Sequence, residues 1–118
     1  MIFREIKAQA QPGTAIPETS YRVKGIGKRR GEDALVYLIP NRKASSSPHQ
    51  KGVTGLEFER AYQHLTEDGD FTRRWFKLNM PDCEKEGPCQ FLAIGGLFVL
   101  LGRASKQRGR YVLRSEPL

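Results

Sequence analysis

The chain has 118 residues, a formal net charge of +7, and 38% hydrophobic and 9% aromatic residues. This is enough for a single domain, residues 1–118, with a real core. Its longest apolar run, FLAIGGLFVLL, covers only residues 91–101, whereas a membrane-spanning helix needs about 20 residues. The first residues carry charges at Arg4, Glu5 and Lys7 and lack the long apolar core of a secretion signal. We therefore expect a cytoplasmic protein without a membrane partner.

Residues 1–40 are predicted to contain a β-hairpin. Two β-prone runs, SYRVKGIG at 20–27 and ALVYLIP at 34–40, flank the polar segment KRRGED, which contains a glycine and reads as a turn. Residues 8–19 look irregular, and a short strand near Ile2 and Phe3 is compatible with the sequence. Residues 41–53 are rich in Ser, Pro and Lys and are predicted to be a loop.

A helix is predicted from Thr54 to Gly69. Thr54 and Glu57 have the spacing of a capping box, in which each side chain bonds the backbone N–H of the other residue. Apolar residues then follow at i, i+3, i+4 and i+7, namely Phe58, Ala61, Tyr62 and Leu65. His64 falls outside this stripe, so we expect a solvated surface side chain.

A second helix is predicted over residues 71–79, capped by Asp70 and stopped by Pro81. Its buried stripe would consist of Phe71, Trp75 and Leu78. The opposite face is basic and contains Arg73, Arg74 and Lys77. Two amphipathic helices joined by a short turn resemble a helix-turn-helix, whose second helix would face DNA. The alternative is an ordinary helical hairpin with a solvated basic face.

The run FLAIGGLFVLL permits two structures. Gly95-Gly96 is a turn dipeptide, which would make the run a hairpin. Ile94, Leu97, Phe98 and Leu101 instead follow helical spacing, with Gly102 as a stop signal. We favour a buried helix in which the two glycines allow a close approach of neighbouring elements. A face left uncovered would be a candidate dimer surface, because monomers rarely expose large apolar patches.

Three helices followed by a basic β-hairpin, ASKQRG leading into RYVLR, resemble a winged helix-turn-helix domain over roughly residues 53–114. Together with the N-terminal β-hairpin (1–40) and the loop (41–53) predicted above, we expect an α+β fold. The resemblance implies a three-helix, winged-helix-like core with a C-terminal β-wing (54–118). It also implies that Lys106, Arg108 and Arg110 are wing residues that could meet a phosphate backbone. The third helix, which should read the bases, is nearly all apolar and offers only Gln90 for a base edge.

The charge distribution points to a polyanionic partner. Net charge is +5 over residues 1–50, −2 over residues 51–89, and +4 over residues 90–118. We expect a small module that binds nucleic acid, namely duplex DNA, mainly through its phosphates. The expected contact residues are Arg73, Arg74, Lys77, Lys106, Arg108, Arg110, and Lys28, Arg29 and Arg30 in the first turn. The alternative is a protein–protein interaction or oligomerisation domain, including a homodimer, in which these basic residues only solubilise.

No catalytic constellation stands out, and we expect a protein that is not an enzyme. PDCEK at residues 81–85 superficially resembles a nuclease metal site, but its acidic groups and lysine are crowded into one loop. Cys83 and Cys89 have five residues between them and form half a zinc site at best, so we expect free thiols and no cofactor or metal.

Overall fold

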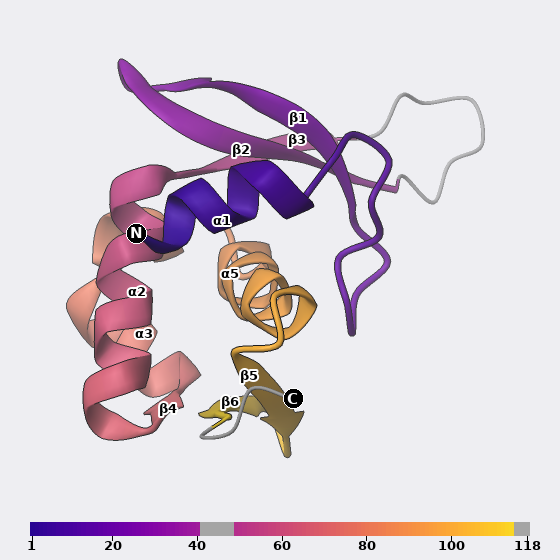
Figure 1. Cartoon of the computed structure of the whole chain (residues 1–118). Helices are drawn as coiled ribbons and strands as arrows, with labels where there is room; N and C mark the ends of the chain where they lie inside the picture. Colours follow the sequence, from indigo (N-terminus) through magenta and orange to yellow (C-terminus); the bar gives the residue numbers. More distant parts are fainter. Residues whose placement is uncertain (41–48, 115–118) are drawn as a thin grey trace.

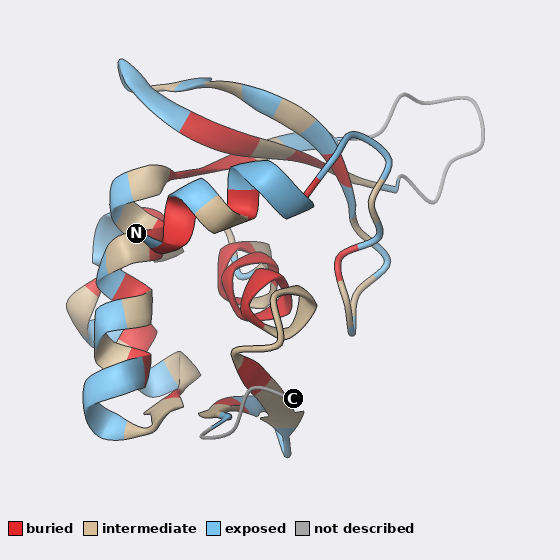
Figure 2. Cartoon of the chain, viewed as in Figure 1, coloured by how far each residue is buried: buried red, intermediate tan, exposed pale blue. Residues whose placement is uncertain are grey.

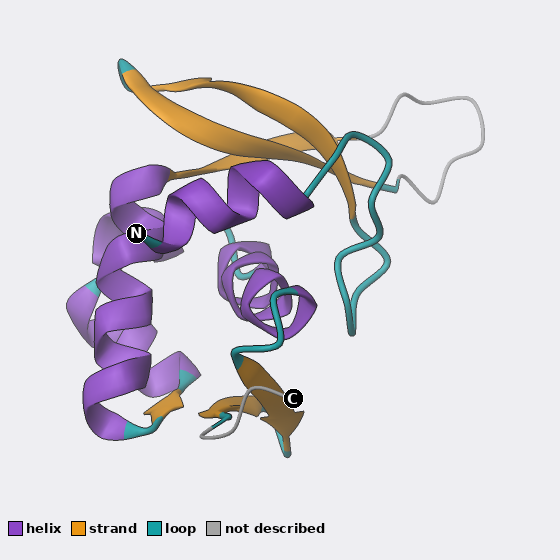
Figure 3. Cartoon of the chain, in the orientation of Figure 1, coloured by secondary structure: helices purple, strands orange, loops and turns teal. Residues whose placement is uncertain are grey.

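A computed structural model describes residues 1–40 and 49–114, and these residues form a mixed α+β fold (Figures 1 and 3). They contain five helices and two small antiparallel sheets. The N-terminal elements are α1 (Ile2–Gln9), β1 (Arg22–Arg29), β2 (Glu32–Ile39) and β3 (His49–Thr54). They are followed by α2 (Gly55–Asp68), β4 (Asp70–Phe71), α3 (Arg73–Asn79), α4 (Pro81–Glu84), α5 (Cys89–Leu100), β5 (Ala104–Gln107) and β6 (Arg110–Leu113).

The first sheet has the order β1-β2-β3, and β1 and β2 pair where the sequence predicts a hairpin. The connecting turn is only Arg30-Gly31, with φ angles of 51° and 77°, as a two-residue hairpin turn requires. The wider turn predicted over residues 28–33 is therefore wrong, because Lys28 and Arg29 continue the ladder and pair with Asp33 and Glu32.

The third strand of this sheet corrects the predicted loop. His49–Thr54 pairs with the free edge of β2, so residues 49–53 are strand; residues 41–48 of that loop lie outside the described residues. A polar segment such as HQKG has little strand propensity of its own. The edge of β2 supplies the hydrogen bonds that fix it.

The N-terminus is a helix rather than a short strand. Ile2, Phe3 and Ile6 of α1 are buried in the core. The backbone N–H groups of Ile2 and Phe3 donate to the carboxylate of Glu59, at 3.3 and 2.9 Å. Two of the N–H groups that a helix leaves unpaired at its start are thus satisfied from α2 rather than by a neighbouring residue.

Helix α2 follows the prediction closely. Thr54 Oγ1 accepts from the Glu57 N–H at 3.2 Å, Glu57 Oε1 accepts from the Thr54 N–H at 2.9 Å, and Gly69 ends the helix with φ 84°. The expectation for His64 was wrong, because its side chain is only 12% exposed and its ring stacks on Trp75 at a centroid distance of 3.9 Å.

Helix α3 begins later than predicted, which changes its buried face. Thr72, and not Asp70, caps it by accepting from the Trp75 N–H at 3.1 Å, while Asp70–Phe71 form the short strand β4. Because Phe71 lies outside the helix, the predicted stripe of Phe71, Trp75 and Leu78 is not the face that α3 buries. Phe76 is fully buried and Leu78 is 69% exposed.

Helix α5 confirms the helical interpretation of FLAIGGLFVLL and lies at the centre of the fold (Figures 1 and 2). It is buried on most of its circumference by other segments of its own chain, rather than by a partner subunit. A Cβ at Gly95 would lie 2.1 Å from the Tyr111 ring, and one at Gly96 would lie 2.4 Å from Ile16. The glycine pair therefore serves close packing in the helix and makes no turn.

The second sheet has the order β4-β6-β5. β5 and β6 form the predicted C-terminal hairpin through the turn Arg108-Gly109, with φ angles of 50° and 80°. This turn is shorter than the predicted segment ASKQRG, because residues 104–107 are strand. The sequence did not reveal β4, whose two residues pair with Tyr111 and Val112 of β6. We call β5, β6 and their turn the wing.

Candidate nucleic-acid interface

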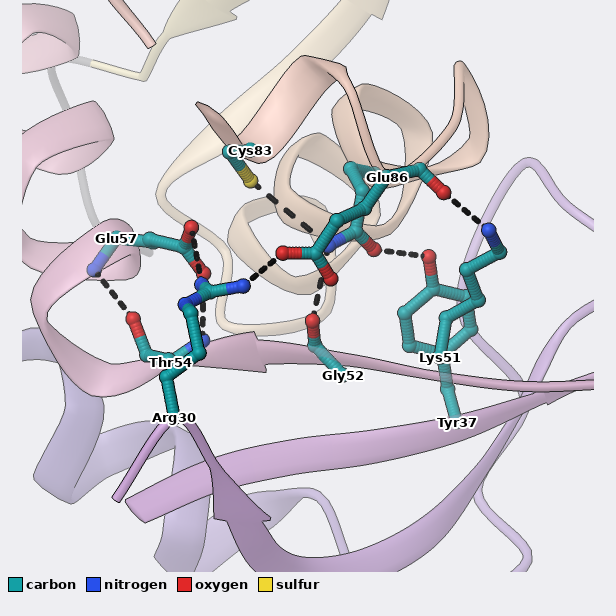
Figure 4. A network of polar contacts seen from close by, with 9 residues as sticks. Arg30, Tyr37, Lys51, Gly52, Thr54, Glu57, Cys83 and Glu86 are labelled. Carbon is teal, nitrogen blue, oxygen red and sulfur yellow. Dashed lines mark hydrogen bonds and ion pairs between the residues drawn. The ribbon is translucent and has the colours of Figure 1, made fainter. Parts of the chain in front are cut away.

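The basic residues of the β1–β2 hairpin are mostly engaged within the chain. Lys28 Nζ lies 2.6 Å from Asp33 Oδ1, and this hydrogen bond raises the pKa of Lys28 and lowers that of Asp33. Arg30 reaches from the turn to α2 and to the segment before α5, where it forms ion pairs with Glu57, at 2.9 Å, and Glu86 (Figure 4). We call Arg30, Glu57 and Glu86 the Arg30 cluster.

Arg29 is half-buried against the first sheet. Its side chain crosses Gly52 of β3, where a Cβ would lie 2.6 Å from Arg29 Nε. That Nε is buried and has no hydrogen-bond partner among the described residues. Arg29 thus packs on the sheet with its aliphatic stem and Nε.

Gln90, the only polar residue of the third helix considered for base reading, is fully buried. Its Oε1 accepts from the Tyr37 hydroxyl, and its Nε2 donates to the Gly52 carbonyl at 2.9 Å. The thiol of Cys83 lies 3.8 Å from Nε2, and burial raises its pKa. Gln90 therefore joins α5 to the first sheet and cannot contact a base edge.

The three basic residues of α3 differ in their surroundings. The Arg73 guanidinium lies over the Phe91 ring at 4.7 Å and donates to the Pro88 carbonyl at 3.3 Å. Arg74 and Lys77 are exposed, and neither forms an ion pair within the described residues. They are the free cations of this helix.

The wing also contains bound and free cations. Arg110 forms an ion pair with Asp70 at 3.0 Å, and the Lys106 ammonium lies 5.9 Å from the centre of the Tyr111 ring. Arg108 is exposed at the turn and has no ion-pair partner in residues 1–40 and 49–114.

The nine predicted residues do not form one surface. Strand β4 leads directly into α3 and pairs with β6, so the start of α3 and the wing are neighbours. The β1–β2 hairpin lies at the opposite end of the molecule from the wing (Figure 1). The structure thus places the start of α3 beside β6 of the wing and separates both elements from Lys28, Arg29 and Arg30.

Sequence reasoning missed one cation near the wing. Arg114 follows β6 and is exposed, and its backbone N–H donates to the Arg103 carbonyl at 3.0 Å. It ends the predicted strand RYVLR, in which arginines flank three apolar residues, and this basic end of the strand was the available signal.

Two further observations concern the described residues alone. None of their helices combines the length and apolar character needed to cross a membrane. Nor do they contain a cluster of three or more His, Cys, Asp or Glu side chains placed to hold a metal ion. Comparisons of the chain with protein-family models, with curated proteins and with solved structures produced no match.

Proposed function

We propose that this protein is a small cytoplasmic nucleic-acid-binding module, and that it binds the phosphate backbone of duplex DNA through the wing and the exposed cations of α3. The observation that carries the proposal is that α3 and the wing, which β4 connects, expose Arg74, Lys77 and Arg108. None of these three side chains has a counter-ion among the described residues. Such side chains can exchange condensed counterions for phosphate contacts.

The element order supports a winged-helix-like frame for this surface. Helices α2, α3 and α5 are followed by the β5–β6 hairpin, and β4 between the first two helices completes the sheet order β4-β6-β5. The departure from that frame is α5, which would be the reading helix. Because α5 is buried, the proposed contacts position the protein on a duplex without reading its bases.

The two hairpin turns provide a matched test. Arg30 and Arg108 both occupy the left-handed position before a glycine in a two-residue turn, with φ 51° and 50°. Asparagine tolerates this conformation better than most residues, so Arg→Asn removes the cation and keeps the turn. Arg30 is held by two carboxylates, whereas no described residue pairs with Arg108.

The measurement is fluorescence anisotropy of a labelled duplex, titrated with protein over a salt series. Arg108→Asn should weaken binding by a similar factor on every duplex sequence and should reduce the slope of log K against log salt by about 0.9. Arg30→Asn should leave that slope unchanged. A flat salt response of the unmodified protein, or equal effects of the two variants, would remove the wing from the proposal.

The second candidate is a protein–protein interaction or oligomerisation domain without a nucleic-acid role. Leu56 and Leu78 favour it, because these large apolar side chains are 63% and 69% exposed. Absence of duplex and single-strand binding at low salt would select this candidate.

A further inference from the structure

Leu56 and Leu78 belong to one surface, formed between α2 and the α3–α4 segment. The first borders a hollow of about 310 Å³, and the second borders a neighbouring hollow of about 290 Å³. Asn79 lines both hollows, so they adjoin. We call this surface the α2–α3 groove.

One side of the groove is formed by α2, where Glu57 and one row of residues line it. Leu56, Arg60, His64 and Asp68 recur at every fourth position, which places them along one side of a helix. The row extends over about 18 Å at 1.5 Å per residue. The other side of the groove is formed by α3 and α4, and its lining residues there include Trp75, Leu78, Met80 and Asp82.

The groove has an exposed apolar side chain, a hollow, and both acidic and basic side chains. Leu78 projects from α3, while Met80 and the buried Cys83 line the hollow beside Leu56. Arg60 and Asp82 are both exposed on the rim of that hollow, and they form no ion pair with each other. A surface with these properties is complementary to itself.

Net charge strengthens the case for a second copy as the occupant. Two chains of net charge +7 repel one another, and the wing and the β1–β2 hairpin carry concentrated basic residues. The two hollows are lined by Arg60 and Arg74 and by Asp68 and Asp82, while their other acidic residues, Glu57 and Asp70, are paired with Arg30 and Arg110. The net charge of the groove is therefore far below that of the whole chain, so repulsion between copies is weaker there. Across a twofold axis, Arg60 of each copy would face Asp82 of the other, which gives two ion pairs from one arrangement.

We propose that the α2–α3 groove is the interface of a homodimer, in which Leu78 of each copy enters the hollow beside Leu56 of the other. This interface differs from the dimer surface expected on the apolar helix of residues 91–101, which the chain covers itself. The wing lies outside the groove, whereas Arg74 of the proposed phosphate-binding surface lines it. The dimer is therefore tested in the absence of nucleic acid.

The test is sedimentation velocity over a concentration series of the full chain and its variants. The unmodified protein should dimerise with rising concentration, and Leu78→Glu should remain monomeric. Arg60→Glu and Asp82→Arg should each raise the dimer Kd by roughly tenfold or more, because a twofold axis repeats each like-charge contact. The double variant should restore the Kd to within roughly threefold, since opposite charges again face each other.

A matched control is Lys77→Glu, which changes the net charge as Arg60→Glu does but alters an exposed α3 residue that does not line the groove. It should leave the dimer Kd no higher than that of the unmodified protein, while circular dichroism verifies that each variant is folded. A chain that is monomeric at all concentrations would overturn the proposal. So would a double variant no better than the single ones, or a Leu78→Glu protein that still dimerises.

Discussion

Gly95→Ala tests directly why a glycine pair stands inside the most buried helix. An added Cβ would lie 2.1 Å from Cε2 and 2.2 Å from Cζ of the Tyr111 ring. That ring is fully buried and packs against Phe91 and Phe71, at centroid distances of 5.3 and 6.2 Å, so it has little room to retreat. Overpacking of this kind costs about 1–3 kcal/mol and occasionally more, whereas alanine gains about 1 kcal/mol in helix propensity.

We place the clash at the upper end of that range because the contact is shorter than real Cβ contacts by almost 1 Å. The net loss in the free energy of unfolding is then about 2 kcal/mol, with a fall in Tm of roughly 6–12 °C. Urea unfolding followed by circular dichroism measures it. In a Tyr111→Leu background the same substitution should be neutral or stabilising, since the ring is gone. An equal loss in both backgrounds would refute the steric explanation.

Three further predictions test the packing and the ion pairs. Burial raises the pKa of Tyr111 from 10.0 to about 12, so the unfolded chain releases this proton at lower pH than the folded chain does. The free energy of unfolding should therefore fall by about 2–3 kcal/mol as pH rises from 10 to 12, and Tyr111→Phe should lack this fall. Parallel plots of unfolding free energy against pH for the variant and the unmodified chain would contradict this. Arg30→Asn should lower the free energy of unfolding by about 1 kcal/mol in urea titrations, and less at high salt, because its ion pair with Glu86 is partly exposed. In thermal unfolding, Phe76→Ala should lower the free energy of unfolding by about 3–5 kcal/mol and Trp75→Ala by clearly less, because only Phe76 is fully buried. A larger loss for Trp75→Ala would mean that Trp75 faces the core, as the sequence predicts.

Local signals explain which elements the sequence could predict. Helix α2 carries its own start and stop, a capping box at Thr54 and Glu57 and a glycine at its end, so its bounds follow from neighbouring residues. Helix α1 has no such signal, because Glu59 caps it from a distant point of the chain. Strands β3 and β4 likewise form on edges that β2 and β6 provide, and a single sequence does not reveal those edges.

The sequence likewise predicts only part of the candidate site. Composition identifies the basic residues, but only the fold shows which of them are already paired. Arg30 and Arg108 have the same local sequence context, an arginine before a glycine in a hairpin turn. Glu57 and Glu86 form ion pairs with Arg30 and not with Arg108. These carboxylates are 27 and 56 residues from Arg30 in the sequence, and only the fold brings them to it. No short-range pattern predicts such contacts.

The burial of α5 sets how selective any nucleic-acid binding can be. Helix insertion into the major groove is what gives a duplex-binding helix access to base edges, and here Gln90 is fully buried and bonded to Tyr37 and Gly52. If the wing and α3 hold a duplex through phosphates, unrelated duplexes of equal length should compete for the protein with affinities within about threefold, because phosphate contacts carry no sequence information. A specific reader instead loses about 1–3 kcal/mol for each mismatched base pair. Competition of unlabelled duplexes against one labelled duplex measures this difference, and a preference beyond roughly tenfold would mean that bases are read by a surface other than α5.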